Sequence, residues 1–217
     1  MKCARTIAIF AAFAALASAA GPTALTQDDA GLEAKARATH ARILSVDTHT
    51  DTAMRMTNPS FDVGQRHETG KPGSGLVDLP RMVDGCLDAL FFGVFVGQGE
   101  LTPQGYDNAR TRALAMIDAV RKMTEKYPNL VGLATTPADA YRIKKEGKRI
   151  AFIGMENGYP VGTDLGRLSE YAALGTRYLT LVHSSDNQIC DSSTDRRNAE
   201  DKGLSSFGRE VVAECNR

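Results

Sequence analysis

The sequence places acidic and histidine side chains where predicted strands end. Asp47, His49 and Asp51 lie at alternate positions in "SVDTHTDTAMRM". Alternate residues of an extended backbone point to the same side, so His49 and Asp51 can present an imidazole and a carboxylate to one metal ion. This combination suits zinc. Asp47 points the same way, and we interpret it as a group that supports the ligands or caps a helix, not as a third ligand.

Two further strand ends carry candidate residues. Glu156 follows the apolar run "IAFIGM", and His183 follows "YLTLV". A carboxylate at the mouth of a parallel strand is costly to bury unless it meets a cation or a hydrogen-bond donor. We interpret Glu156 as a metal ligand whose two oxygens can face two ions; the alternative is a helix-capping or salt-bridged acid. His183 is a candidate catalytic residue, with a purely structural histidine as the alternative.

Alternating strands and helices must position these residues. The predicted strands cover residues 43–48, 87–96, 150–155 and 177–182, with a weaker one in "NLVGLAT". The predicted helices are 103–126 and the segments "TPADAYRIKKEG", "LGRLSEYAALG" and "LSSFGREVVAECNR". This alternation predicts an α/β fold with a parallel sheet, in which the carboxyl ends of the strands form one face.

The number of strands predicts an incomplete barrel. A (β/α)₈ barrel needs eight strands and about 250 residues, whereas four strong strands are predicted here. We therefore expect a helical lead-in at residues 21–41 and the N-terminal half of a (β/α)₈ TIM-type barrel at 42–217. Residues 57–77 are rich in glycine and proline. They predict a long loop of the kind that is usually functional or disordered.

The first twenty residues have the pattern of a signal peptide. Lys2 and Arg5 precede an apolar run at 7–16 and small residues at 17–20. This order is typical of a secretory signal, and the apolar run is too short for a membrane span. A buried N-terminal helix is the alternative. We therefore expect an exported protein, periplasmic or secreted, without a transmembrane span.

Charge and cysteine content limit the possible partners. The chain has 26 basic and 26 acidic residues, so nothing suggests a nucleic-acid partner. Beyond the signal, Cys86, Cys190 and Cys215 are spaced too widely for a CxxC metal site. In an oxidising compartment one pair could form a disulfide, and the sequence leaves open which pair.

Five motifs in order resemble the membrane dipeptidase (renal dipeptidase) family of zinc metallopeptidases, especially its bacterial exported branch. They extend from about Ile43 to Arg217 and read "VDTHTD", "VDLPRMVDGCLDALFFGVF", "GMENG", "YLTLVHSSDNQICDSS" and "GLSSFGREVVAECNR". Cys86 stands where relatives usually have glycine or another small residue.

The resemblance implies a (β/α)₈ barrel with two zinc ions that hydrolyses dipeptides, and a homodimer is the common assembly in the family. It implies that His49 and Asp51 bind one zinc and that Glu156 bridges both. His183 is then the residue that polarises the scissile carbonyl, which a metal-bridging hydroxide attacks. The remaining ligands are expected beyond Arg217, so this piece is expected to be inactive alone.

Two other functions remain open from the sequence. The chain could belong to another metal-dependent barrel hydrolase, such as an amidase or a lactamase. It could also belong to a non-catalytic exported binding protein. Metal analysis and a panel of dipeptides and lactams separate these readings.

Overall fold

The computed structural model describes residues 27–197 and 202–217. The predicted signal peptide lies outside these ranges. The chain divides into two compact units, residues 1–39 and 40–217. The described part of the first unit lies in helix α1 (Gln27–Arg42), which overlaps the predicted lead-in at 21–41. None of the helices in the described ranges is both long and apolar enough to cross a bilayer.

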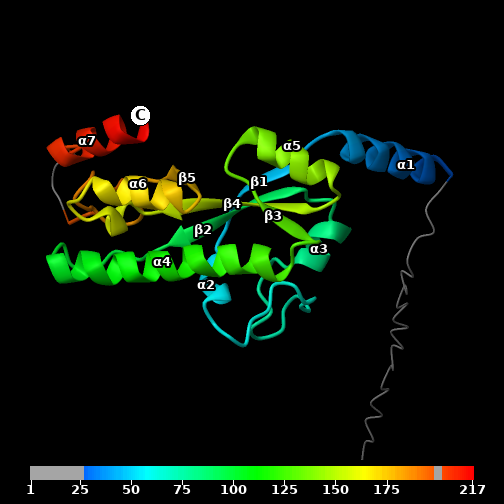
Figure 1. Ribbon diagram of the computed structural model, residues 1–217, viewed down its shortest axis with the longest axis horizontal. Helices are drawn as coiled ribbons and strands as arrows, with labels where there is room; N and C mark the ends of the chain where they lie inside the picture. Colours follow the sequence, from blue (N-terminus) through cyan, green and yellow to red (C-terminus); the bar gives the residue numbers. More distant parts are fainter. Residues whose placement is uncertain (1–26, 198–201) are drawn as a thin grey trace, which may run out of the picture. The chain divides into compact units, whose positions relative to one another are not determined.

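The second unit is built on a parallel sheet (Figure 1). Its strands are β1 (Val46–Thr50), β2 (Ala89–Phe95), β3 (Val131–Leu133), β4 (Arg149–Glu156) and β5 (Thr176–Leu179). The order is β1-β2-β4-β3, and β5 also pairs with β4. Strand β2 pairs along its whole length with one side of β4. Strands β3 and β5 therefore share the other side of β4, with β3 at the beginning of β4 and β5 near the end of β4.

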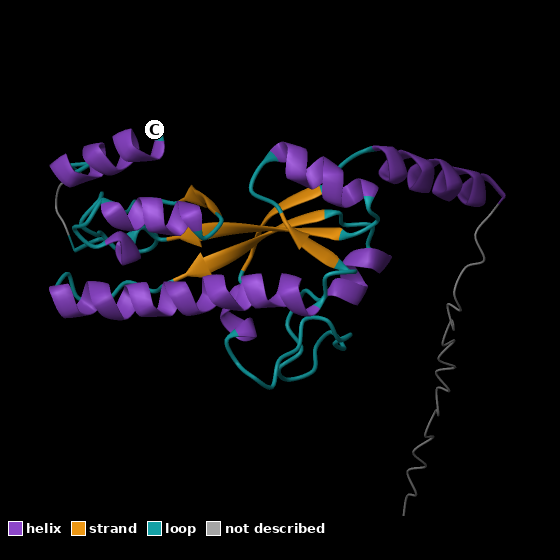
Figure 2. Cartoon of the chain, in the orientation of Figure 1, coloured by secondary structure: helices purple, strands orange, loops and turns teal. Residues whose placement is uncertain are grey.

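Helices follow the strands in alternation, as Figure 2 shows in purple and orange. They are α2 (Thr52–Met56), α3 (Leu79–Asp84), α4 (Pro103–Lys126), α5 (Pro137–Lys145), α6 (Gly166–Ala173) and α7 (Ser206–Cys215), with a 3₁₀ turn η1 at Tyr159–Val161. The predicted α/β fold with parallel strands is therefore confirmed, and the helices at 103–126 and after Thr136 begin where predicted.

Helix α4 shows why this pattern folds as it does. The Thr102 side chain accepts a hydrogen bond from the Gly105 N–H, and Pro103 occupies the first turn, where its missing N–H is not needed. Apolar side chains at helical spacing form the buried face of α4: Ala109, Ala113, Met116, Ile117, Val120 and Met123. This face covers β2, β3 and β4.

Two strands differ from the prediction. The predicted strand at 43–48 corresponds to β1 at Val46–Thr50, and Val46 to His49 are exposed, because among the described residues β1 pairs only with β2. The fourth predicted strand, 177–182, ends earlier, at Leu179. Strand β4 has ended by then, and the carbonyl of Leu181 instead accepts from the N–H of Gly158 and the side chain of Asn187.

Asp88 ties together the amino ends of the strands. Its carboxylate accepts from the N–H and hydroxyl of Ser45 at 3.0 and 3.1 Å and lies 2.6 Å from Nζ of Lys144. Arg149 lies 3.5 Å from its other oxygen. Burial raises the pKa of this carboxyl, but the hydrogen bonds from Lys144 and Ser45 outweigh burial and leave the pKa below its ordinary value. Asp88 is therefore an anion that links β1, α5 and β4.

The predicted long loop is confirmed: no helix or strand lies between Met56 and Leu79 (Figure 2). The chain nevertheless fixes this loop at two points. Asp62 accepts from the hydroxyl of Tyr127 at 2.6 Å, which attaches the loop to the end of α4. Fully buried Asp78, the N-cap of α3, accepts from the backbone N–H of His67 at 2.8 Å.

The cysteines form no disulfide in the described residues. Cys86, Cys190 and Cys215 are all free, so the pairing that we considered possible is not present. They lie on three different elements: Cys86 follows α3, Cys190 lies in an isolated bridge with Leu204, and Cys215 ends α7. Cys86 has a φ of 54°, a left-handed conformation that favours glycine, which agrees with the small residue expected there.

Candidate metal centre

The carboxyl ends of β1 and β4 bring three predicted ligands together. His49, Asp51 and Glu156 each offer one ligand atom, and these atoms lie within 4.8 Å of one another. His49 Nε2 is 3.3 Å from Asp51 Oδ1 and 3.1 Å from Glu156 Oε2. An imidazole with two carboxylates is a donor set that zinc accepts, so the residues fit a metal ion.

Local structure fixes the position of Asp51. It is the residue directly before α2, whose first residues, Thr52 and Ala53, are buried. The Asp51 side chain makes no capping hydrogen bond to α2, so it is free to face His49. The sequence did not indicate α2, because its five residues are too few to show a helical period.

His183 joins the same cluster from the segment after β5. Its Nε2 lies 3.3 Å from Glu156 Oε1, the oxygen that does not contact His49. The ring packs edge-on against Phe95, with ring centroids 4.9 Å apart, and Nδ1 lies 2.7 Å from the hydroxyl of Ser184. Glu156 thus stands between the two histidines, with one oxygen facing each.

Asp47 contacts the main chain of the segment that carries the ligands. Its Oδ1 accepts from the backbone N–H of His49 at 3.0 Å, and the side chain is exposed. The N-cap of the next helix is Asp51. Asp47 therefore supports the backbone of the ligand segment, whereas Asp51 precedes the helix.

The partner of the His49 ring is Tyr178, which sequence reasoning missed. The hydroxyl of Tyr178 lies 2.8 Å from His49 Nδ1. Burial, followed by the charges of Glu156 and Asp51, raises the pKa of this phenol, so it carries its proton. No sequence motif marks Tyr178, because its contact with His49 depends on how the strands between β1 and β5 are aligned.

Two glycines make room for these rings. Gly93 and Gly154 are register partners on β2 and β4, and Gly154 is also paired with Tyr178. A Cβ at Gly93 would lie 2.6 Å from His49 Cε1, and one at Gly154 would lie 2.0 Å from Cζ of Tyr178. The floor of the site is therefore bare main chain, onto which the two rings pack.

A buried amide pair holds the strand ends. Asn157 has a φ of 74°, and its side chain donates to the carbonyl of Val96 at 2.9 Å while accepting from Asn187 at 3.0 Å. Its backbone N–H donates to the hydroxyl of Thr180 at 2.8 Å. The residue after Glu156 thus joins the ends of β2, β4 and β5, which fixes the direction of the Glu156 side chain.

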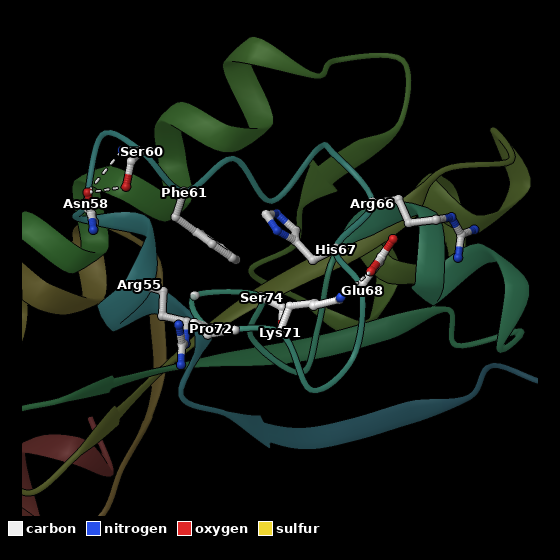
Figure 3. Close-up of a pocket in the computed structure, with 11 residues that line it drawn as sticks. Arg55, Asn58, Ser60, Phe61, Arg66, His67, Glu68, Lys71, Pro72 and Ser74 are labelled. Carbon is white, nitrogen blue, oxygen red and sulfur yellow. Dashed lines mark hydrogen bonds and ion pairs between the residues drawn. The ribbon is translucent and has the colours of Figure 1, made fainter.

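A cleft of about 730 Å³ opens beside the ligands, lined by His49, Asp51 and Arg55 and by residues 70–76 of the long loop. A neighbouring pocket of about 460 Å³ shares Arg55 and part of that loop (Figure 3). There, His67 stacks on Phe61 with centroids 4.6 Å apart, and its Nε2 lies 2.8 Å from the carbonyl of Asp62. His67 therefore shapes the loop and is not one of the three clustered ligands.

Comparisons with known proteins identify a family for this chain. The family model for membrane dipeptidases, peptidase family M19, matches residues 33–217. The dipeptidase tcpJ of Claviceps purpurea is 31% identical over 161 residues, which cover 72% of this chain and 38% of that protein.

Solved structures give the same result. The probable dipeptidase PvdM of Pseudomonas aeruginosa superposes with a TM-score of 0.68 at 29% identity, over 85% of this chain and 47% of that one. A metallopeptidase of Rhodobacter sphaeroides, solved with a phosphinate mimic of the dipeptide L-Ala-D-Ala, gives 0.66 at 25% identity, over 81% and 56%. The chain thus spans about half or less of the length of these relatives, and its sheet corresponds to part of their barrel-type fold. Because the family model matches most of the sequence, the chain belongs to the membrane dipeptidase family of metallopeptidases.

Proposed function

We propose that the protein containing this chain is a zinc-dependent dipeptidase, in which His49, Asp51 and Glu156 hold zinc. The observation that carries the proposal is the meeting of these three ligand atoms within 4.8 Å at two strand ends, beside a cleft. When bound, zinc supplies a Lewis acid and lowers the pKa of water to near 7.

The chain's own residues have separate tasks in this proposal. Glu156 turns one oxygen to His49 and the other to His183, so it can contact two ions. His183, whose side chain is 43% exposed, can donate a hydrogen bond from Nε2 to the oxygen of the scissile carbonyl in place of its contact with Glu156 Oε1 at 3.3 Å. Such a donor stabilises the negative charge that develops on that oxygen.

The first experiment combines metal analysis with a peptidase assay on the complete protein. We expect zinc to copurify and L-Ala-D-Ala to be hydrolysed, because a relative was solved with a mimic of that dipeptide. His49→Ala removes a ligand, so both zinc content and turnover should fall by more than the 10–100-fold that loss of a supporting residue typically costs.

His40→Ala is the matched control, since His40 is an exposed histidine of α1. It should keep full zinc content and turnover. Full turnover by His49→Ala would contradict the assignment of His49 as a ligand. Hydrolysis of a lactam in preference to every dipeptide would indicate the amidase or lactamase alternative, and a complete protein that holds no metal would indicate the binding protein.

Two parts of the proposal go beyond this chain's described residues. Two zinc ions per complete enzyme stays a prediction, and we assign the further ligands of the second ion to no described residue. A homodimer likewise stays a prediction, to be tested by sedimentation of the complete protein.

A further inference from the structure

We propose that Tyr178 is a positioning residue of the metal centre, whose hydroxyl holds the imidazole of His49 with Nε2 directed at the ion. The inference rests on the proposed function, since it concerns the same site. It adds a residue from β5 to a site otherwise built from the ends of β1 and β4.

The first argument is the direction of the two ring nitrogens of His49. Nε2 faces the carboxylates of Asp51 and Glu156, at 3.3 and 3.1 Å. Nδ1 faces away from them, 2.8 Å from the Tyr178 hydroxyl. The Tyr178 hydroxyl is therefore the hydrogen-bond partner of the ring nitrogen that does not face the carboxylates.

The second argument is the chemistry of an imidazole ligand. A neutral imidazole that binds a metal through Nε2 carries its proton on Nδ1, and the partner of that proton fixes the tautomer and the ring orientation. The phenol oxygen of Tyr178 can accept a hydrogen bond from this N–H. A phenol can also donate, so the contact persists when His49 instead donates from Nε2 to a carboxylate.

The third argument is how firmly the phenol is placed. Tyr178 is the register partner of Gly154, and its ring lies where a Cβ of that residue would be. On one side the ring packs against Phe91, with centroids 5.2 Å apart. A tyrosine from β5 thus reaches across the glycines of β4 and β2 to a histidine of β1, a path that side chains at Gly93 and Gly154 would block.

The test compares two phenylalanine variants of the complete protein, with zinc affinity measured by competition against a chromophoric chelator. Tyr178→Phe removes only the hydroxyl and should weaken zinc binding by about 10–100-fold. Tyr171→Phe is the matched control, because that buried hydroxyl donates to the carbonyl of Pro160 at 2.9 Å, away from the ligands. It should leave zinc affinity unchanged while lowering stability.

A second measurement follows the His49 ring itself. In the zinc-loaded wild-type protein, ¹⁵N-resolved NMR of His49 should show a proton on Nδ1 that exchanges slowly, and Tyr178→Phe should make its exchange faster. Unchanged zinc affinity in Tyr178→Phe, or zinc bound through Nδ1, would overturn the inference while leaving the dipeptidase proposal intact. A wild-type protein that binds no zinc would instead overturn the proposed function.

Discussion

At the scale of residues, the site depends on glycines, which lack a side chain, as much as on its ligands. His49 and Asp51 were recognisable because alternate positions of a strand share a face. Gly93 was not recognisable, because its role follows from the ring that packs above it. Tyr178 was missed for the same reason: which residues of two non-adjacent strands meet depends on register, which the sequence does not state.

Gly93→Ala tests whether the bare floor matters. Its new Cβ would lie 2.6 Å from His49 Cε1 and 3.2 Å from the carbonyl oxygen of Thr50, so the ligand strand must shift. We expect weaker zinc binding and a loss of stability of roughly 1–3 kcal/mol, the usual cost of overpacking. Competition titration and urea unfolding measure the two effects.

Gly97→Ala provides the comparison for Gly93→Ala. Gly97 follows the same strand, and a Cβ there would meet nothing within 4 Å. Its zinc affinity should equal that of the wild type. Equal affinity in Gly93→Ala as well would show that the His49 ring does not need the space above the glycine.

At the scale of elements, the sequence predicted what periodicity controls and missed what lateral contacts control. Helix α4 matched its prediction, since its buried positions repeat at helical spacing. The convergence of Glu156 with His49 also followed from the sequence, because parallel strands bring their carboxyl ends to one face. The exposure of β1 and the early end of β5 did not follow, since both depend on which strand or turn lies alongside.

The Asp88 network predicts a pH dependence of stability. The folded pKa of Asp88 lies below the ordinary value of 3.8, so its stabilising effect is complete above that value and is lost as the pH falls through the folded pKa. Asp88→Asn leaves Lys144 and Arg149 without their anion and should lower the unfolding free energy by about 2 kcal/mol at pH 7. The difference in unfolding free energy between wild type and variant, measured by urea unfolding, should shrink as the pH falls below 3.8 towards the folded pKa.

Asp118→Asn is the control for the Asp88 variant. Asp118 pairs with Lys122 on the exposed side of α4, where solvent screens the charges. Its effect should be small at every pH. An Asp88→Asn deficit that stays constant from pH 7 to pH 3 would mean that packing, and not the charge of Asp88, stabilises this end of the sheet.

At the scale of the whole molecule, we propose export through the signal sequence at residues 1–20. Expression of the complete reading frame in a Gram-negative host should give a periplasmic protein that begins near Ala20, since small residues at 17–20 suit signal cleavage. Intact-mass measurement of the purified protein tests this. Phe13→Asp, which interrupts the apolar run, should keep the uncleaved chain in the cytoplasm, and a periplasmic protein that retains Met1 would contradict the proposal.

The contact between His49 and Tyr178 also couples metal binding to the relative positions of β1 and β5. β1 and β5 are separated by β2 and β4, about 14 Å of strand spacing. The two side chains bridge this distance, so a movement of β1 away from β5 would pull the rings apart. A ligand that binds only the form in which the two rings are in contact stabilises that form by mass action. Zinc should accordingly stabilise the positions of β1 and β5 relative to each other. Hydrogen exchange in both strands should therefore slow together when zinc binds.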